Sequence, residues 1–147
     1  MTQYYIGVKQ IMAWPQQKDG QDGYAVKYPD GYISWSPKAT FEAAYLPMGE
    51  GNDGSRITPE MVRAFITGPQ RIERMGNHAV VHVGLRNGFS LIEESACVDA
   101  KNYDEGIGVE LAMKKAENRV WHLLGFLLAS ARNGILPRLT SNETKAD

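Results

Sequence analysis

The longest helical pattern of the chain constrains its fold more than any other feature. Between residues 103 and 132 the large apolar residues recur at spacings that give a helix one wide apolar face. These residues are Ile107, Leu111, Val120, Leu123, Leu124, Leu127 and Leu128. Asn102 is the predicted N-cap and Glu105 stands at the capping-box position, because their side chains can satisfy unpaired N–H groups at a helix start. Gly134 suits the C-terminal turn, and Pro137 prevents the helix from continuing.

The segments before this helix predict strands joined by a tight turn. The apolar-rich segment 89–98 reads as a strand that leads towards the helix. Asn87 and Gly88 precede it, and this pair is a strong hairpin signal because both turn positions favour positive φ. The segments 71–75 and 79–85 are predicted strands as well. A two-turn helix is expected from Thr58-Pro59 to Gly68-Pro69, with Thr58 as its cap.

The first 46 residues predict a small antiparallel sheet with a short helix. One strand is expected from Tyr4 to Trp14, and two more flank the turn at Pro29-Asp30-Gly31. Ser36-Pro37 has the sequence of a helix start, with Ser36 as N-cap. The fold class is therefore α+β: an N-terminal antiparallel sheet with a short helix, then a β-hairpin followed by a long C-terminal helix. The expected divisions are a β-rich module (1–46), a linker (47–57), the hairpin and long helix (58–136) and a flexible tail (137–147).

Composition limits the class of function. The chain has 147 residues with 16 Lys+Arg against 17 Asp+Glu, a formal net charge of −1. No general attraction to nucleic acid or to an anionic membrane is therefore expected, and neither a membrane nor a sequence-specific nucleic acid is a predicted partner. The single cysteine, Cys97, excludes an intramolecular disulfide and a cysteine-based zinc cage, which fits a reducing cytoplasm.

The titratable residues do not indicate an enzyme. His78 and His82 lie on one face of a predicted strand, but about 13 Å apart, too far to bind one metal ion. Asp99, Asp104 and Glu105 cluster at the entrance of the long helix and resemble a hard-cation site, but helix capping explains the same residues without a metal. No serine elbow, zinc-binding helix motif or dinucleotide fingerprint occurs in the sequence. We expect no catalytic residue, no metal and no cofactor.

Recognition chemistry is better represented, and it gathers in two regions. The first is the N-terminal hairpin and the helix start that follows it, where Tyr32 and Trp35 offer stacking faces and Ser36 and Lys38 lie near unpaired N–H groups. The competing interpretation is that the aromatic residues of this hairpin only pack a small core.

The second region is the long helix, and the sequence reasoning favours it slightly. Arg119 can hold a phosphate with its planar guanidinium, and the segment from Asp99 to Asn102 can meet it across an oligomer interface. The helix carries more apolar positions than one thin sheet can cover. We therefore expect a homo-oligomer with residues 120–128 in its interface.

Two resemblances add to this interpretation. Segment 58–132 resembles the phage gene-product-49/gene-66 family, through Glu94-Ser-Ala-Cys-Val-Asp99, Asn102-Tyr-Asp-Glu105 and Ala116-Glu-Asn-Arg-Val-Trp121. The segment from Gly23 to Lys38 resembles an N-terminal module of prophage accessory proteins, in a version that lacks most of the tract between the first strand and the hairpin. Similar modules are fused to domains of the Thoeris anti-defence type, which sequester nucleotide immune signals.

The resemblances imply a phage-encoded, non-enzymatic anti-defence protein that binds and sequesters a nucleotide-type immune signal in the host cytoplasm. This expectation rests only on the domains to which similar modules are fused. The alternative is a phage protein–protein interaction module, either an inhibitor of a host defence protein or a virion or replication accessory.

Overall fold

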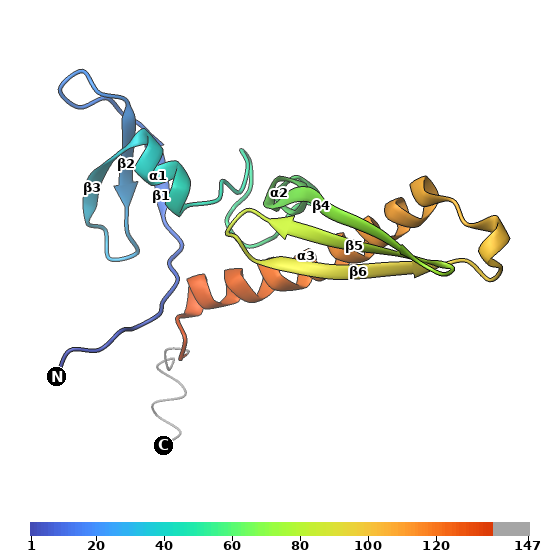
Figure 1. Cartoon of the computed structure of the whole chain (residues 1–147). Coiled ribbons are helices and arrows are strands. Elements are labelled where there is room, and N and C mark those ends of the chain that lie inside the picture. Colours follow the sequence, from blue (N-terminus) through green and yellow to red (C-terminus); the bar gives the residue numbers. More distant parts are fainter. Residues whose placement is uncertain (137–147) are drawn as a thin grey trace. The chain divides into compact units, whose positions relative to one another are not determined.

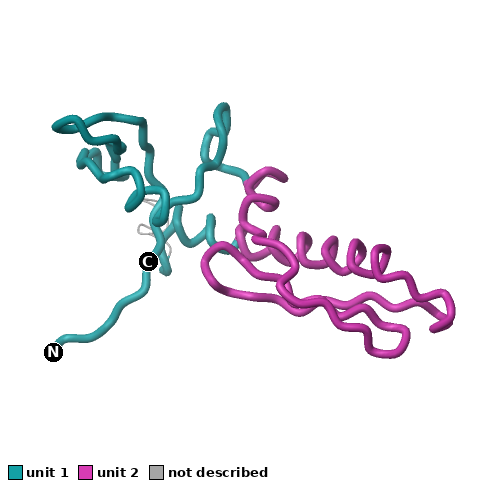
Figure 2. Tube along the Cα trace, turned by 45° about the horizontal axis from the view of Figure 1, so that its top comes forward, with its two compact units in different colours: residues 1–56, 126–147 teal, residues 57–125 magenta. Residues whose placement is uncertain are grey.

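The computed structural model describes residues 1–136, which form two compact units (Figure 2). Of these residues, the first unit contains 1–56 and 126–136, and the second contains Ile57–Gly125. Each unit has its own three-stranded antiparallel sheet. The predicted α+β class, with an N-terminal sheet, a short helix, further strands and a long C-terminal helix, is confirmed. The predicted flexible tail, 137–147, lies outside the described residues.

The sheet of the first unit is a meander with the order β1-β2-β3 (Figure 1). Its elements are β1 (Met12–Pro15), β2 (Gly23–Lys27), β3 (Ile33–Pro37) and the helix α1 (Lys38–Ala44). The turn predicted between β2 and β3 is confirmed: Gly31 N donates to Tyr28 O at 2.9 Å, and Gly31 has a φ of +90°. Glycine tolerates this left-handed conformation at little cost.

Two predictions for this unit were wrong. The first strand begins at Met12 rather than Tyr4, because Met12 already pairs with Lys27, the last residue of β2. Residues before Met12 therefore have no partner in this sheet. Ser36 lies in β3 and does not cap the helix; Pro37 is the N-cap of α1, and no side chain caps it. The pairing of β3 with β2 continues as far as Pro37, and it keeps Ser36 in the strand.

The second unit is built on a sheet with the order β4-β5-β6 and a long helix. Its elements are α2 (Pro59–Phe65), β4 (Ile66–Met75), β5 (His78–Leu85), β6 (Ser90–Ala96), the short 3-10 helix η1 (Ala100–Asn102) and α3 (Glu105–Asn133). The predicted cap of α2 is confirmed, since Thr58 Oγ1 accepts from Met61 N at 3.3 Å. Gly68 and Pro69 do not end α2 but lie inside β4, beside two register shifts. Proline is tolerated there because β4 is an edge strand with bulges.

The predicted turn between β5 and β6 is confirmed, but its geometry differs from the expectation. Gly88 has a φ of +89°, whereas Asn87 does not have a positive φ. Leu85 N donates to Phe89 O at 2.8 Å, and Gly88 N donates to Leu85 O at 3.0 Å. The connection is therefore a three-residue loop that ends in a glycine, not the two-residue turn that the Asn-Gly pair predicted.

The core of the second unit lies between its sheet and α3. The inward side chains of β5 are less than 5 % exposed: Ala79, Val81, Val83 and Leu85. The buried residues of α3 repeat every four positions: Ala112, Ala116, Val120 and Leu124. Two residues of the predicted apolar face, Ile107 and Leu111, are instead 60 % and 47 % exposed. The pattern of large residues missed the alanines, whose small side chains let the helix lie close to the sheet.

This burial also corrects the predicted oligomer interface. Val120 and Leu124 are 0 % and 2 % exposed within the chain itself, so they are not available to a second copy. Leu127, by contrast, is 39 % exposed. Burial thus excludes Val120 and Leu124 from the predicted interface, whereas Leu123 and Phe126 of the same segment are 37 % and 74 % exposed, and the homo-oligomer stays a prediction. Within residues 1–136, no helix combines the length and the hydropathy that a membrane span requires.

The start of α3 differs from the prediction by two residues. Asp104 is the capping residue: Ile107 N donates to Asp104 Oδ1 at 3.0 Å, and Gly108 N donates to Asp104 O at 2.9 Å. Asn102 ends η1, and Glu105 is the first residue of α3 rather than the third. The extended backbone of Tyr103 (ψ 127°) separates the two helices, which prevents Asn102 from capping the long one.

Candidate ligand-binding surface

The four N-terminal residues predicted as a site do not form one cluster. Side chains alternate between the faces of a strand, so the neighbours Trp35 and Ser36 lie on opposite sides of the sheet. Ser36 pairs with Tyr24, whose ring stacks on Phe41 of α1 at 4.2 Å. Ser36 therefore faces the side of the sheet that α1 covers. Tyr32 lies beyond the turn, 65 % exposed, with its ring centroid 6.1 Å from that of Tyr28.

Trp35 belongs to the opposite side of the sheet, which we call the aromatic face. The large apolar residues of the aromatic face are Met12, Trp14, Ile33 and Trp35, and Ala25 lies between the two tryptophans. Trp14 and Trp35 both pair with Ala25, so the three side chains form one row across the strands. Met12 is 68 % and Ile33 52 % exposed, which shows that the face is open to solvent. Ala25 is nevertheless only 1 % exposed, as expected for a small side chain between two indole rings.

Trp35 is held in a fixed orientation. Its indole Nε1 donates to Gln16 O at 2.7 Å. Its ring lies against Gly23, where a Cβ atom would stand 2.4 Å from Trp35 Cζ2. Only glycine permits this approach, because real Cβ contacts are not that short. A ring whose polar atom is satisfied and whose position is fixed loses little side-chain freedom when a ligand stacks on it.

Positive charge lies next to the aromatic face. The ammonium of Lys18 is 5.7 Å from the centroid of the Trp35 ring. Lys27 lies between Met12 and Ile33 in the row beside the tryptophans. Flat rings next to ammonium groups are the combination that a nucleotide requires, since its base stacks and its phosphate binds cations.

A hollow of about 330 Å³ adjoins the residues that hold Trp35. It is lined by Pro15, Gln16, Gln17, Asp22, Gly23, Tyr24 and Lys38. Its size is at the lower end of the range for small-molecule pockets, about 300–1,000 Å³. Lys38, predicted as a site residue, is the first residue of α1 and lines this hollow. Trp35 itself does not line it. Asp22 Oδ1 accepts from Gln17 Nε2 at 2.8 Å.

The predicted site on the long helix looks different. A cavity of about 80 Å³ lies at the start of α3, and Asn102, Tyr103, Cys97 and Gly108 are among its lining residues. The Tyr103 hydroxyl is buried there without a hydrogen-bond partner among the described residues. The cavity has room for a few water molecules but is much smaller than a nucleotide pocket. The Asp99 carboxylate is engaged elsewhere, because it accepts from Lys101 N at 3.0 Å.

Arg119 does not approach Asp99 or Asn102 within the chain. It lies 14 residues beyond Glu105 on α3, about 21 Å along the helix axis at the usual rise. Its guanidinium forms an ion pair with Glu93, with Nη1 2.8 Å from Oε1, and the Glu93 side chain is only 13 % exposed. This ion pair joins α3 to β6 and gives Arg119 a structural role.

Sequence reasoning missed Trp14, Gly23 and Lys18. The register of the sheet places Trp14 in the row of Trp35, and the position of that ring explains Gly23. A partial signal was available, since Trp14 and Trp35 each stand on a predicted strand. The alternation of side chains along each strand could not show that Trp14 and Trp35 lie on the same side of the sheet, because this depends on the strand register.

The family comparison concerns mainly the second unit. The model of the Phage protein (N4 Gp49/phage Sf6 gene 66) family matches residues 57–131, about half of the chain. This match supports the resemblance expected for segment 58–132. No curated protein matches the chain, and no solved structure matches it.

Proposed function

We propose that this phage-encoded chain, which belongs to the Phage protein (N4 Gp49/phage Sf6 gene 66) family, binds and sequesters a nucleotide-type immune signal of the infected host. Binding alone removes such a signal, so the proposal requires no catalytic step. The protein would act in the host cytoplasm, where the signal is produced. The observation that carries the proposal is the row of Trp14, Ala25 and Trp35 with Lys18 beside it.

The chemistry of this row suits a base and a phosphate. Stacking of a base on an aromatic side chain contributes about 1–3 kcal/mol. Trp35 is already fixed by its hydrogen bond to Gln16 O, so little of this energy is lost in ordering the ring. Lys18 and Lys27 offer mobile ammonium groups to phosphate oxygens. The formal net charge of the whole chain is −1, so attraction of an anionic ligand depends on these local lysines.

Calorimetric titration of the full chain with cyclic nucleotides and adenosine diphosphate ribose tests the proposal. Trp35→Ala is expected to weaken binding by roughly 5- to 150-fold, which corresponds to the loss of one stacked base. Trp121→Ala is the control, because Trp121 is an exposed tryptophan (38 %) on α3 in the second unit, away from the aromatic face. A far-ultraviolet spectrum like that of the unchanged protein shows that each variant is folded.

The result that contradicts the proposal is equally specific. If none of the nucleotides binds, or if Trp35→Ala and Trp121→Ala bind with the same affinity as the unchanged protein, the aromatic face is not the site. Purified protein that carries a captured nucleotide should show excess absorbance at 260 nm relative to 280 nm.

A protein–protein interaction module is the second candidate function. It is favoured by a different observation, the exposed side of the sheet in the second unit, where Met75 and Ile92 are 60 % and 66 % exposed. An inhibitor of a host defence protein or a virion or replication accessory would use such a surface. In that case the purified protein would show no excess absorbance at 260 nm, and Trp35→Ala would leave its activity intact.

A further inference from the structure

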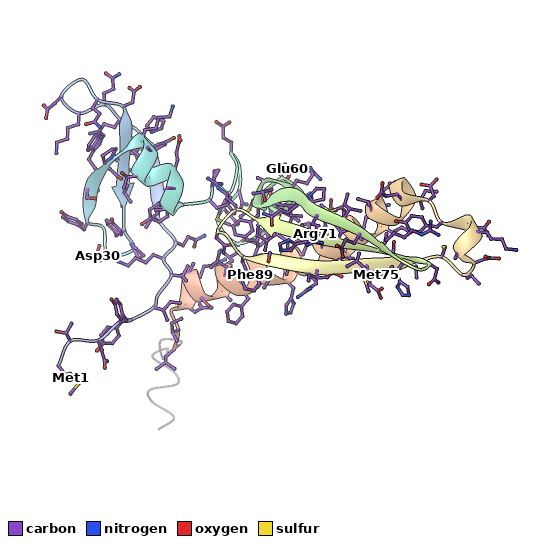
Figure 3. The ribbon with its side chains drawn as sticks, in the orientation of Figure 1. Met1, Asp30, Glu60, Arg71, Met75 and Phe89 are labelled. Atoms are coloured by element: carbon purple, nitrogen blue, oxygen red, sulfur yellow. The ribbon has the colours of Figure 1, made fainter. Side chains whose placement is uncertain are left out.

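The sheet of the second unit is covered by α3 on one side only. The inward side chains of β5 pack on α3, and the outward ones are His78, Val80 and His82, all partly exposed. On the neighbouring strand β4, Arg71 and Met75, both labelled in Figure 3, belong to the same outward side, because they pair with His82 and His78. We call this side the open sheet face.

The register arranges the charges of the open sheet face in rows across the strands. One row contains Glu73, Val80 and Glu94, and we call it the acidic row. The next contains Arg71, His82 and Ile92, and we call it the basic row. Adjacent rows on one face of a sheet are about 7 Å apart. The register therefore fixes the order of Arg71 and the two acids, Glu73 and Glu94, along the strands. Their side chains are accessible to solvent: that of Arg71 is 73 % exposed and that of Glu73 is 48 % exposed.

We propose that a second copy of this chain docks on the open sheet face, about a two-fold axis that crosses the strands between the acidic and basic rows. A two-fold interface brings the same surface of each copy together. With this axis, each Glu73 faces the partner's Arg71, so opposite charges meet twice. A two-fold axis parallel to the strands would instead place Glu73 over the partner's Glu94. A two-fold axis that crosses the strands along the acidic row would place Glu73 over the partner's Glu73. Both alternatives bring like charges together. The charge pattern thus selects one orientation.

The apolar side chains of the same face gain cover in this orientation. Ile92 and Met75 are more than half exposed in one copy, and burial of such side chains drives association. Arg71 and Glu73 already contact each other within the chain, so the dimer would form a cluster of four alternating charges. Three strands and four rows span roughly 400 Å² per copy, about half of a standard interface. The dimer should therefore dissociate on dilution.

Charge reversal in two separate variants tests this orientation. Arg71→Glu leaves two acids on the β4 part of the face, at 71 and 73, and Glu73→Arg leaves two arginines there. Each variant alone should repel its own copy, and its dissociation constant should rise at least tenfold. An equimolar mixture should form a heterodimer, because an acidic face then meets a basic one. Mixing cannot restore the ion pair within one chain, so recovery reports contact between copies.

Sedimentation velocity over a concentration series measures each sample. Glu110→Arg and Lys114→Glu make the same kind of change on the exposed side of α3 and should leave the dimer unchanged. The unchanged protein sedimenting as a monomer up to millimolar concentration overturns the proposal. So do single variants that dimerise like the unchanged protein, or folded single variants whose mixture remains monomeric. Ile92→Ser keeps all charges and should also weaken the dimer; unchanged association of this variant would count against the face.

Discussion

Gly108 provides the sharpest test of how α3 packs on its sheet. A Cβ atom at this position would stand 2.7 Å from Ala79 Cβ and 3.3 Å from Ser95 Oγ. Ala79 is 1 % exposed and belongs to the central strand, so its side chain has nowhere to move. Gly108→Ala should therefore destabilise the protein, although alanine is the better helix former.

The change in unfolding free energy caused by Gly108→Ala is the sum of two opposed effects. Replacing glycine by alanine inside a helix stabilises by about 1 kcal/mol. Overpacking of a filled core costs about 1–3 kcal/mol. The net expected loss for Gly108→Ala is therefore roughly 0–2 kcal/mol of unfolding free energy. Part of the cost comes from Ser95, whose hydroxyl donates to Gly108 O at 2.6 Å and would be displaced.

Gly125→Ala is the matched control in the same helix. A Cβ atom there would have nothing within 4 Å. Only the propensity effect remains, and this variant should gain about 1 kcal/mol. The difference between the two variants cancels the propensity effect and isolates the cost of the contact, about 1–3 kcal/mol.

Urea unfolding followed by far-ultraviolet circular dichroism measures both variants against the unchanged protein. Ala79→Gly combined with Gly108→Ala should recover part of the loss, because it removes the atom that the new methyl group meets. If Gly108→Ala proves as stabilising as Gly125→Ala, the helix does not lie against β5 at this point, and the reasoning is refuted.

Two further predictions concern the start of α3 and its ion pair with β6. Asp104→Ala should cost about 0.5–2 kcal/mol of unfolding free energy, because Asp104 caps the helix, whereas Asn102→Ala should cost much less; equal losses in urea unfolding would restore Asn102 as the cap. Arg119→Ala should lower the melting temperature slightly because it leaves the partly buried Glu93 unpaired. The nucleotide affinity of this variant in calorimetry should stay unchanged. If the variant keeps full stability but loses nucleotide binding, the site lies on the long helix.

Local chemistry determined much of the fold from the sequence. The turn at Gly31, the cap at Thr58 and the turn at Gly88 each rest on a residue whose backbone preference is strong and short-ranged. The long helix was predictable for the same reason, since its periodicity extends over many turns. Its start was not, because Asp99, Asn102 and Asp104 are all good capping residues and only the chain path decides among them.

The tertiary structure alone decided which surfaces face one another. Ala112 and Ala116 carry no strong apolar signal, yet close approach to the sheet buries them completely, while Ile107 is left in solvent. Trp14 and Trp35 are 21 positions apart in the sequence (35 − 14), and only the strand register places both beside Ala25. A shift of one residue would turn either ring to the other side of the sheet. Register depends on the whole sheet, and this is why the composition of the aromatic face could not be deduced from the sequence.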